Sequence, residues 1–218
     1  MVLIAEENKA QVKNHLPWLD WLRFLAAFAV LLGHTRSFVF APYGNLDGDS
    51  QGILTAVAFL TMRFGHHAVL FFFVISGFLV GGRMLERLRL GSFDEKSYVD
   101  RATRIMVPLV PVLCATALVQ VLIGNSIDWI SFLGNLFSLQ RVLVSSFGDN
   151  LPLWSLAYEV WFYILALGFA FVFTGRRPLI GTIIFILVFL VFTRLDAIYL
   201  FSWCIGAAVY STLSLIHI

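Results

Sequence analysis

Residues 18–40 read WLDWLRFLAAFAVLLGHTRSFVF, an apolar run that is long enough to form a helix across a membrane. The run nevertheless contains Asp20, Arg23 and His34. Ionisable side chains inside a membrane-spanning helix are costly, so each of them is a candidate functional residue. Ten residues separate Arg23 from His34. This interval is about three helical turns, which places the two side chains on one stripe, roughly 16 Å apart along the axis.

The composition is that of a membrane protein. Of 218 residues, 60% are hydrophobic, 22 are phenylalanine and only 13% are charged, whereas about a quarter of a soluble domain is charged. Three further uncharged windows are long enough to cross a bilayer, at residues 64–82, 105–127 and 197–218. These features predict an all-α fold, a polytopic transmembrane helical bundle.

We expect one domain over residues 1–218 with about six spans. The expected helices cover residues 17–40, 53–82, 105–124 (with Pro108 and Pro111 in its first turns), 154–174, 179–193 and 197–213. Residues 125–150 are expected to form a loop with a short interfacial or re-entrant helix. Basic residues near membrane helices favour the cytoplasmic side. They place the N-terminus, residues 83–104 and Arg176–Arg177 in the cytoplasm of a multi-pass protein of the bacterial inner or plasma membrane.

The sequence gives no indication of nucleic-acid binding or of metal binding. The net charge of +2 gives no sign of nucleic-acid binding. The two cysteines, Cys114 and Cys204, lie in apolar segments without metal-ligand spacing, and no metal site is expected.

The first helix supplies the first candidate pair. Counted from Pro17, Arg23 lies about 9 Å and His34 about 25 Å into the helix. Arg23 could meet an anion that enters from the cytoplasm, and a neutral His34 could take or pass a proton. The alternative is an Asp20–Arg23 ion pair at the interface together with a histidine that is hydrogen-bonded to another helix.

Arg101 and Arg104 form a second candidate pair, because a spacing of three places them on one helical face. Two planar guanidinium groups suit a phosphorylated ligand. On spacing alone, a positive-inside anchor of the next helix is the favoured explanation.

A third group follows Pro152. Glu159 lies in the first turns of the helix expected at 154–174, where a carboxylate could bind sugar hydroxyls or assist proton transfer. Trp154 and Tyr163 could stack on a sugar ring, although they also fit an aromatic belt at the membrane surface. Ser76 and Gly77 interrupt an apolar run, which by itself indicates close helix packing.

Four motifs occur in one order along the chain: LDWLRFLAA (19–27) leading to His34, FFVISGFL (72–79), RATRIMVP (101–108) and WSLAYEVWFY (154–163). Together they resemble the membrane-bound acyltransferase 3 family. Members of this family use an acyl-CoA, usually acetyl-CoA, to O-acylate a glycan or another hydroxyl-bearing acceptor. They typically have about ten helices, so this chain resembles an N-terminal portion.

The resemblance implies roles for individual residues. Arg23 and His34 match the family's essential pair in the first helix, and Arg101 and Arg104 match its donor-binding motif. Glu159 belongs to the Trp-Ser-Leu-x-x-Glu element and counts as catalytic together with that pair. The positions expected to line the active site are Ser76, Gly77, Trp154, Ser155 and Tyr163.

The resulting hypothesis is an integral-membrane O-acetyltransferase whose partners are the lipid bilayer, an acyl-CoA donor and a glycan or other hydroxyl acceptor. Arg101 and Arg104 would hold the donor phosphates, and Arg23 would guide the thioester. His34 would act as general base or as nucleophile. Two alternatives remain open: a small-molecule or proton-coupled transporter that uses His34 and Glu159 as a relay, and a non-catalytic membrane fragment.

Overall fold

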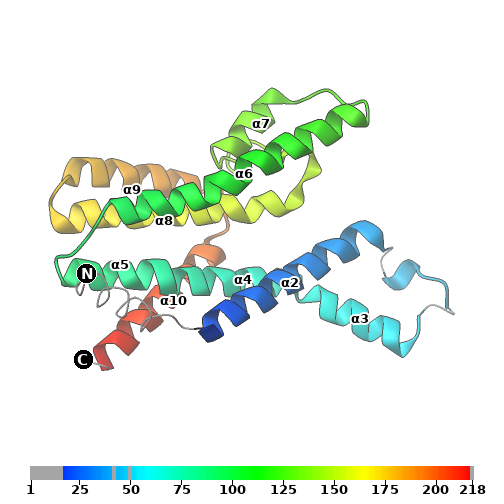
Figure 1. The fold of residues 1–218 in the computed structure, drawn as a ribbon, viewed down its shortest axis with the longest axis horizontal. Helices are drawn as coiled ribbons and strands as arrows, with labels where there is room; N and C mark the ends of the chain where they lie inside the picture. Colours follow the sequence, from blue (N-terminus) through cyan, green and yellow to red (C-terminus); the bar gives the residue numbers. More distant parts are fainter. Residues whose placement is uncertain (1–16, 41–42, 49–50, 217–218) are drawn as a thin grey trace, which may run out of the picture. The chain divides into compact units, whose positions relative to one another are not determined.

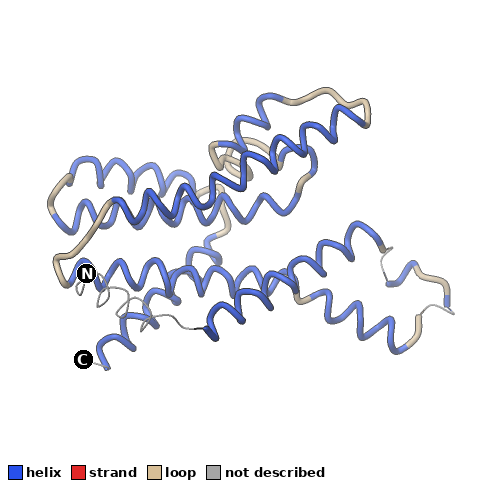
Figure 2. The backbone as a smooth tube through the Cα atoms, in the orientation of Figure 1, coloured by secondary structure: helices blue, strands red, loops and turns tan. Residues whose placement is uncertain are grey.

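The computed structural model describes residues 17–40, 43–48 and 51–216, and this part of the chain is helical (Figures 1 and 2). An isolated bridge between Gln140 and Val144 accompanies the helices. The all-α prediction is confirmed. The N-terminal segment that was expected in the cytoplasm, residues 1–15, lies outside the described residues. The α-helices are α2 (Pro17–Val39), α3 (Ile53–Arg63), α4 (Gly65–Ser76), α5 (Arg83–Arg89), α6 (Lys96–Leu122), α7 (Trp129–Leu136), α8 (Trp154–Thr174), α9 (Pro178–Phe192) and α10 (Ala197–Ile216).

The chain divides into two units, Met1–Phe72 and Phe73–Ile218. In the first unit, α2 begins and ends within one residue of the predicted helix. Arg36, near the end of α2, lies 5.8 Å from the ring centroid of Phe59 in α3, and Tyr43 in the short helix η1 (Tyr43–Asn45) lies 5.5 Å from the same ring. Phe59 thus anchors the end of α2 and the following turn to α3.

The helix predicted at 53–82 is not continuous, and this prediction was wrong. The chain ends α3 at Arg63 and starts α4 at Gly65. A side chain at Gly65 would meet the carbonyl oxygen of Ala29 at 3.0 Å and Gly33 Cα at 3.1 Å. Glycine is therefore needed for the close approach to α2, and it also has a low helix propensity, so the apolar run breaks there.

The second unit begins near the end of α4, which passes into the π-helix η3 (Gly77–Gly82) and then into α5. A Cβ atom at Gly77 would overlap the carbonyl oxygen of Trp203, and one at Gly206 would overlap the carbonyl oxygen of Val74. The backbones of η3 and α10 therefore touch through glycines, as small residues allow in membrane helices.

The third predicted helix begins earlier than expected. It was placed at 105–124 with two prolines in its first turns, but α6 starts at Lys96 and contains Pro108 and Pro111 in its interior. The Asp94 carboxylate accepts hydrogen bonds from the backbone N–H groups of Lys96 (3.0 Å) and Ser97 (3.2 Å). These bonds satisfy donors at the helix start, so the polar segment becomes the first two turns of α6.

The later helices agree with the predicted boundaries. Gly175 ends α8 in the left-handed conformation (φ 64°), and Pro178 occupies the first turn of α9, which packs antiparallel to α8 (Figure 1). This is the expected use of glycine after a helix and of proline at a helix start. The short helix expected within 125–150 is α7.

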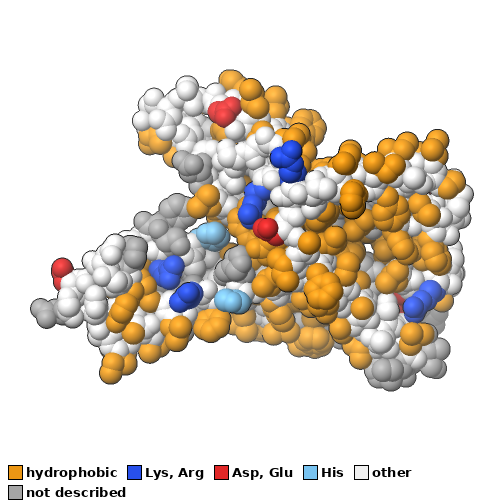
Figure 3. Space-filling view, turned by 180° about the vertical axis from the view of Figure 1, so that it is seen from behind, with side chains coloured by type: hydrophobic (Ala, Val, Ile, Leu, Met, Phe, Trp, Pro, Cys, Tyr) orange, Lys and Arg blue, Asp and Glu red, His pale blue; other side chains and the backbone are white. Residues whose placement is uncertain are grey.

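Four of the described helical segments are long and apolar enough to cross a membrane: His67–Arg89, Lys96–Leu122, Leu151–Thr174 and Ala197–Leu215. Pro178–Phe192 is apolar but shorter, at 15 residues. The predicted span at α2 is not among the four. Figure 3 shows a wide hydrophobic surface on which charged side chains form small, separate groups. The chain is a multi-pass membrane protein.

The N-terminus of α7 gives a prediction about pH. Asp128 accepts hydrogen bonds from the Ser131 hydroxyl (2.6 Å) and from the N–H groups of Ser131 (3.1 Å) and Ile130 (3.0 Å). These bonds, chiefly that from the hydroxyl, lower the pKa of Asp128 below its usual value of 3.8. Because the folded-state pKa lies below the unfolded one, the cap stabilises α7 above the unfolded pKa and is lost as pH falls through the folded pKa. Hydrogen-exchange protection of α7 should therefore drop progressively as the pH falls below 3.8 and through the lower folded-state pKa.

Two variants test this account. Asp128→Ala should lower protection of the Ile130 and Ser131 amides already at pH 7, since alanine cannot cap. Asp128→Asn should retain most of the protection, because asparagine also caps, but should lose its pH dependence. Equal protection in wild type and Asp128→Ala at pH 7 would show that the cap is not needed.

Candidate active site on the second unit

A cluster of three polar side chains is centred on Glu159 in α8. The Ser76 hydroxyl, at the end of α4, donates to Glu159 Oε1 at 2.6 Å. The Tyr163 hydroxyl, one turn further along α8, donates to the same oxygen at 2.7 Å. Hydrogen bonds to a carboxylate at such short distances are of the strong, charge-assisted kind. The structure thus brings together three of the residues that were expected to form the site.

The position of Ser76 depends on the helix contact that follows it. Gly77 is buried against the backbone of Trp203, so its lack of a side chain serves packing between η3 and α10. This contact fixes the end of α4, where Ser76 itself is 6% exposed. The close helix packing predicted from the sequence at Gly77 therefore also holds the neighbouring Ser76 in place.

Arg101 in α6 adds positive charge to this cluster. It lies close enough to Tyr163 for its charge to act on the phenol hydroxyl, and it interacts in the same way with Tyr98. Arg101 is half-buried, whereas Arg104 is exposed on the same side of the helix. The two arginines thus differ in setting: Arg101 is half-buried and within electrostatic range of Tyr163, and Arg104 is exposed.

The beginning of α8 is occupied by aromatic packing. The Trp154 ring lies 5.1 Å from Tyr199, 5.6 Å from Tyr158 and 6.5 Å from Phe73, measured between centroids. The Ser155 hydroxyl donates to the carbonyl oxygen of Pro152 at 3.2 Å. The Ser155 hydroxyl thus bonds back to the segment just before α8, and Trp154 is one ring of an aromatic cluster.

Arg23 and His34 belong to the first unit. On α2, Arg23 is exposed and His34 is half-buried. The predicted stripe runs between them past Ala27, which is exposed, and Val30, which is half-buried. The helix thus carries the two side chains on one face, as the spacing predicts.

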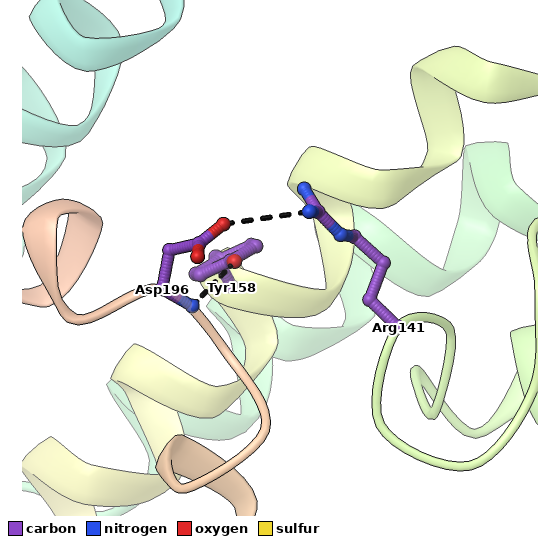
Figure 4. Close-up of polar contacts among 3 residues, drawn as sticks. All are labelled: Arg141, Tyr158 and Asp196. Carbon is purple, nitrogen blue, oxygen red and sulfur yellow. Dashed lines mark hydrogen bonds and ion pairs between the residues drawn. The ribbon is translucent and has the colours of Figure 1, made fainter.

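Several polar residues of the second unit were missed by sequence reasoning. Arg141 lies 3.4 Å from Asp196 Oδ2, and the Asp196 N–H donates to the Tyr158 hydroxyl at 3.0 Å (Figure 4). Elsewhere, the Tyr210 hydroxyl donates to Glu86 Oε2 at 2.6 Å. These pairs join segments that are far apart in the sequence, and nothing in the sequence predicts which residues pair.

Metal binding has no support from the described side chains. Among the residues that the structure describes, no group of three or more histidine, cysteine, aspartate or glutamate side chains is arranged to hold a metal ion.

A family model described as an acyltransferase domain, acyltransferase 3, matches residues 16–215. The chain therefore belongs to the acyltransferase 3 family. The match includes Arg23, His34, Arg101 and Glu159 and so extends over both units. Neither the comparison with curated proteins nor that with solved structures gave a match.

Proposed function

We propose that this membrane protein transfers an acetyl group from acetyl-CoA to a hydroxyl of a glycan or another cell-envelope acceptor. The single observation that carries this proposal is the convergence of Ser76 and Tyr163 on one oxygen of Glu159. Placing a carboxylate inside a membrane protein costs free energy, so such a residue is by default a candidate functional residue. Two hydroxyl donors hold the Glu159 carboxylate in a fixed orientation.

In the proposed reaction, the acceptor hydroxyl oxygen attacks the thioester carbonyl carbon. The hydroxyl proton passes to His34, the carbon–sulfur bond breaks, and CoA leaves as a thiolate that takes up a proton. His34 acts as general base on the acceptor, or first accepts the acyl group as a nucleophile. Glu159 orients the acceptor hydroxyl. Its carboxylate can accept a hydrogen bond from a sugar hydroxyl in addition to those from Ser76 and Tyr163.

The donor is assigned to the arginines of α6. Arg101 and Arg104 lie one turn apart, and forked guanidinium groups bind phosphate oxygens well. Arg23, on the stripe that leads to His34, guides the thioester end of the donor. In the orientation that places the N-terminus in the cytoplasm, these arginines meet acetyl-CoA from the cytoplasm of the cell.

The test of this function uses membranes that contain the protein and acetyl-CoA labelled in the acetyl group. Label should appear in an extractable glycan or lipid-linked glycan and should be released by mild alkali, as an O-acetyl ester is. Membranes without the protein provide the control. Absence of acetyl-CoA-dependent labelling, accompanied by movement of a small solute across the membrane, would contradict the proposal in favour of a transporter.

The donor arginines give a second prediction. Arg101→Gln should raise the KM for acetyl-CoA by about tenfold or more, because a charge-assisted hydrogen bond contributes about 1.5–3 kcal/mol. Arg104→Gln should have a smaller effect, since its exposed charge is screened by solvent. Initial rates at varied acetyl-CoA concentration measure both effects. Arg89→Gln is the control, an exposed arginine at the end of α5. An unchanged KM in the Arg101→Gln, Arg104→Gln double variant would remove these residues from the donor site.

A further inference from the structure

The loop that follows α7 has an unusual backbone. Ser138 (φ 57°) and Arg141 (φ 65°) both adopt the left-handed conformation, although neither is glycine. Such residues are strained and persist only where the surrounding structure holds them. Two such residues lie within four positions of each other, so contacts with the rest of the protein must hold this loop in its conformation.

Buried hydrogen bonds hold the loop against α8. Trp161 Nε1 donates to the carbonyl oxygen of Ser138 at 2.9 Å, and Gln140 Nε2 donates to the carbonyl oxygen of Leu153 at 2.8 Å. Ser138 is 1% and Gln140 0% exposed. Within the described part of the chain, the Ser138 hydroxyl and Gln140 Oε1 have no hydrogen-bond partner, which adds to the free energy required to keep this conformation.

The loop presents the Arg141 side chain at a defined place. Its guanidinium lies 5.5 Å from the ring centroid of Trp154, at the start of α8, and 3.4 Å from Asp196 Oδ2 in the turn before α10. The Tyr158 hydroxyl accepts the Asp196 N–H and so fixes that turn (Figure 4). Three segments of the second unit therefore converge on one charge pair.

The stability that the ion pair itself contributes does not account for the position of Arg141. The side chains of Arg141 and Asp196 are 45% and 58% exposed, and an exposed ion pair contributes little to folding. Two strained residues and two unsatisfied buried polar atoms together cost more than such a pair contributes. The accessible ends of Arg141 and Asp196 point instead to recognition of a ligand.

The chemistry of the pair indicates the kind of ligand. Arg141 offers only donors and Asp196 only acceptors, and their charges cancel. A sugar hydroxyl both donates and accepts, so a neutral sugar can bind to both groups. Beside them lies the half-buried ring of Trp154, whose accessible part can pack against the apolar face of a sugar ring. A few polar groups next to aromatic surface are typical of a small-molecule site.

We infer that Arg141, Asp196 and Trp154 form a binding site for a neutral sugar residue of the acceptor. The identification of this sugar as the acceptor rests on the proposed function. The site lies at the end of the second unit where α9 gives way to α10 and α8 begins. In the orientation proposed above, this end faces the outside, where a cell-envelope glycan is found.

The test measures binding of cellotetraose to the detergent-solubilised full chain by saturation-transfer NMR and titration, without acetyl-CoA. Cellotetraose is neutral, and its glucose rings have apolar faces. Wild type should bind it, with saturation transferred to the ring C–H protons. Arg141→Gln and Asp196→Asn should each weaken binding by about tenfold or more. Arg194→Gln, an exposed arginine in the same turn, is the matched control and should bind as wild type does.

Several results would overturn the inference: no binding by wild type, unchanged affinity in Arg141→Gln, or tighter binding of anionic tetragalacturonate than of cellotetraose. The exchanged variant Arg141→Asp, Asp196→Arg keeps the ion pair but removes the guanidinium from Trp154. Its melting temperature should be close to that of wild type, but its affinity for cellotetraose should stay low. Wild-type affinity in this variant would show that the ion pair only connects the two loops and does not bind the sugar. Acetyl labelling is measured separately, so absent labelling contradicts the proposed function, whereas unchanged binding in Arg141→Gln contradicts only the sugar site.

Discussion

Replacing His34 by alanine is expected to lower acetyl transfer by about 10²–10⁴-fold, the usual contribution of a positioned general acid or base. His34 lies half-buried on α2, on the stripe that begins at Arg23. Alanine removes the proton acceptor and offers no group that could take its place. The loss should appear in kcat at saturating acetyl-CoA, measured as labelled acceptor formed by membranes with equal amounts of protein.

The matched control is His67→Ala, which alters an exposed histidine of the same unit. It should retain transfer within a factor of about two, because exposed substitutions outside special sites usually change little. Both variants must melt near the wild-type temperature for the comparison to hold. A His34→Ala protein that is folded and fully active would falsify the assignment.

A quench experiment separates the two roles left open for His34. If His34 is a nucleophile, wild type incubated with labelled acetyl-CoA and no acceptor should form a labelled, hydroxylamine-sensitive protein adduct. If it is a general base, no adduct forms, and label moves only when the acceptor is present. His34→Ala should form no adduct in either case.

Local signals in the sequence account for much of the helix arrangement. Pro17 marks the start of α2, and Gly175 with Pro178 marks the end of α8 and the start of α9. Each signal acts through backbone geometry that is set within a few residues. Where such signals were present, the predicted ends agree with the structure.

The errors arose where a long-range or cap interaction decides the structure. The break before Gly65 depends on its close approach to Ala29 and Gly33, more than thirty positions away. The early start of α6 depends on Asp94, but the charged residues that follow look like a cytoplasmic loop. A polar segment adjoining a membrane helix can continue the same helix, since hydropathy records the membrane boundary and not the helix boundary.

The candidate site was predictable as a list of residues but not as an arrangement. The motifs indicated Ser76, Glu159 and Tyr163, yet Ser76 and Glu159 lie 83 positions apart, and nothing in the sequence predicts a hydrogen bond between them. Arg141 could not be found at all, because its role depends on a left-handed backbone conformation that arginine rarely adopts. Its significance follows from the fold of the whole loop.

Glu159 provides the other large expected effect, and two substitutions there separate charge from structure. Glu159→Ala leaves the Ser76 and Tyr163 hydroxyls without their acceptor. Unsatisfied buried groups cost about 1–3 kcal/mol each, so this variant should be destabilised as well as inactive. Glu159→Gln keeps an oxygen that can accept both hydrogen bonds, so its melting temperature should stay near that of wild type.

Although folded, Glu159→Gln should transfer acetyl groups at least about 10²-fold more slowly, because the charged acceptor that orients the sugar hydroxyl is gone. The loss should fall on turnover at saturating acetyl-CoA and leave the KM for the donor unchanged. Ser76→Ala and Tyr163→Phe each remove one of the two bonds that fix the carboxylate. If the three residues act as a unit, the double variant Ser76→Ala, Tyr163→Phe should transfer acetyl groups no more slowly than Glu159→Gln. The effects of substitutions on rate do not add when the residues act together. Full activity in a folded Glu159→Gln protein would restrict the cluster to helix packing, and the catalytic role proposed for it would have to be abandoned.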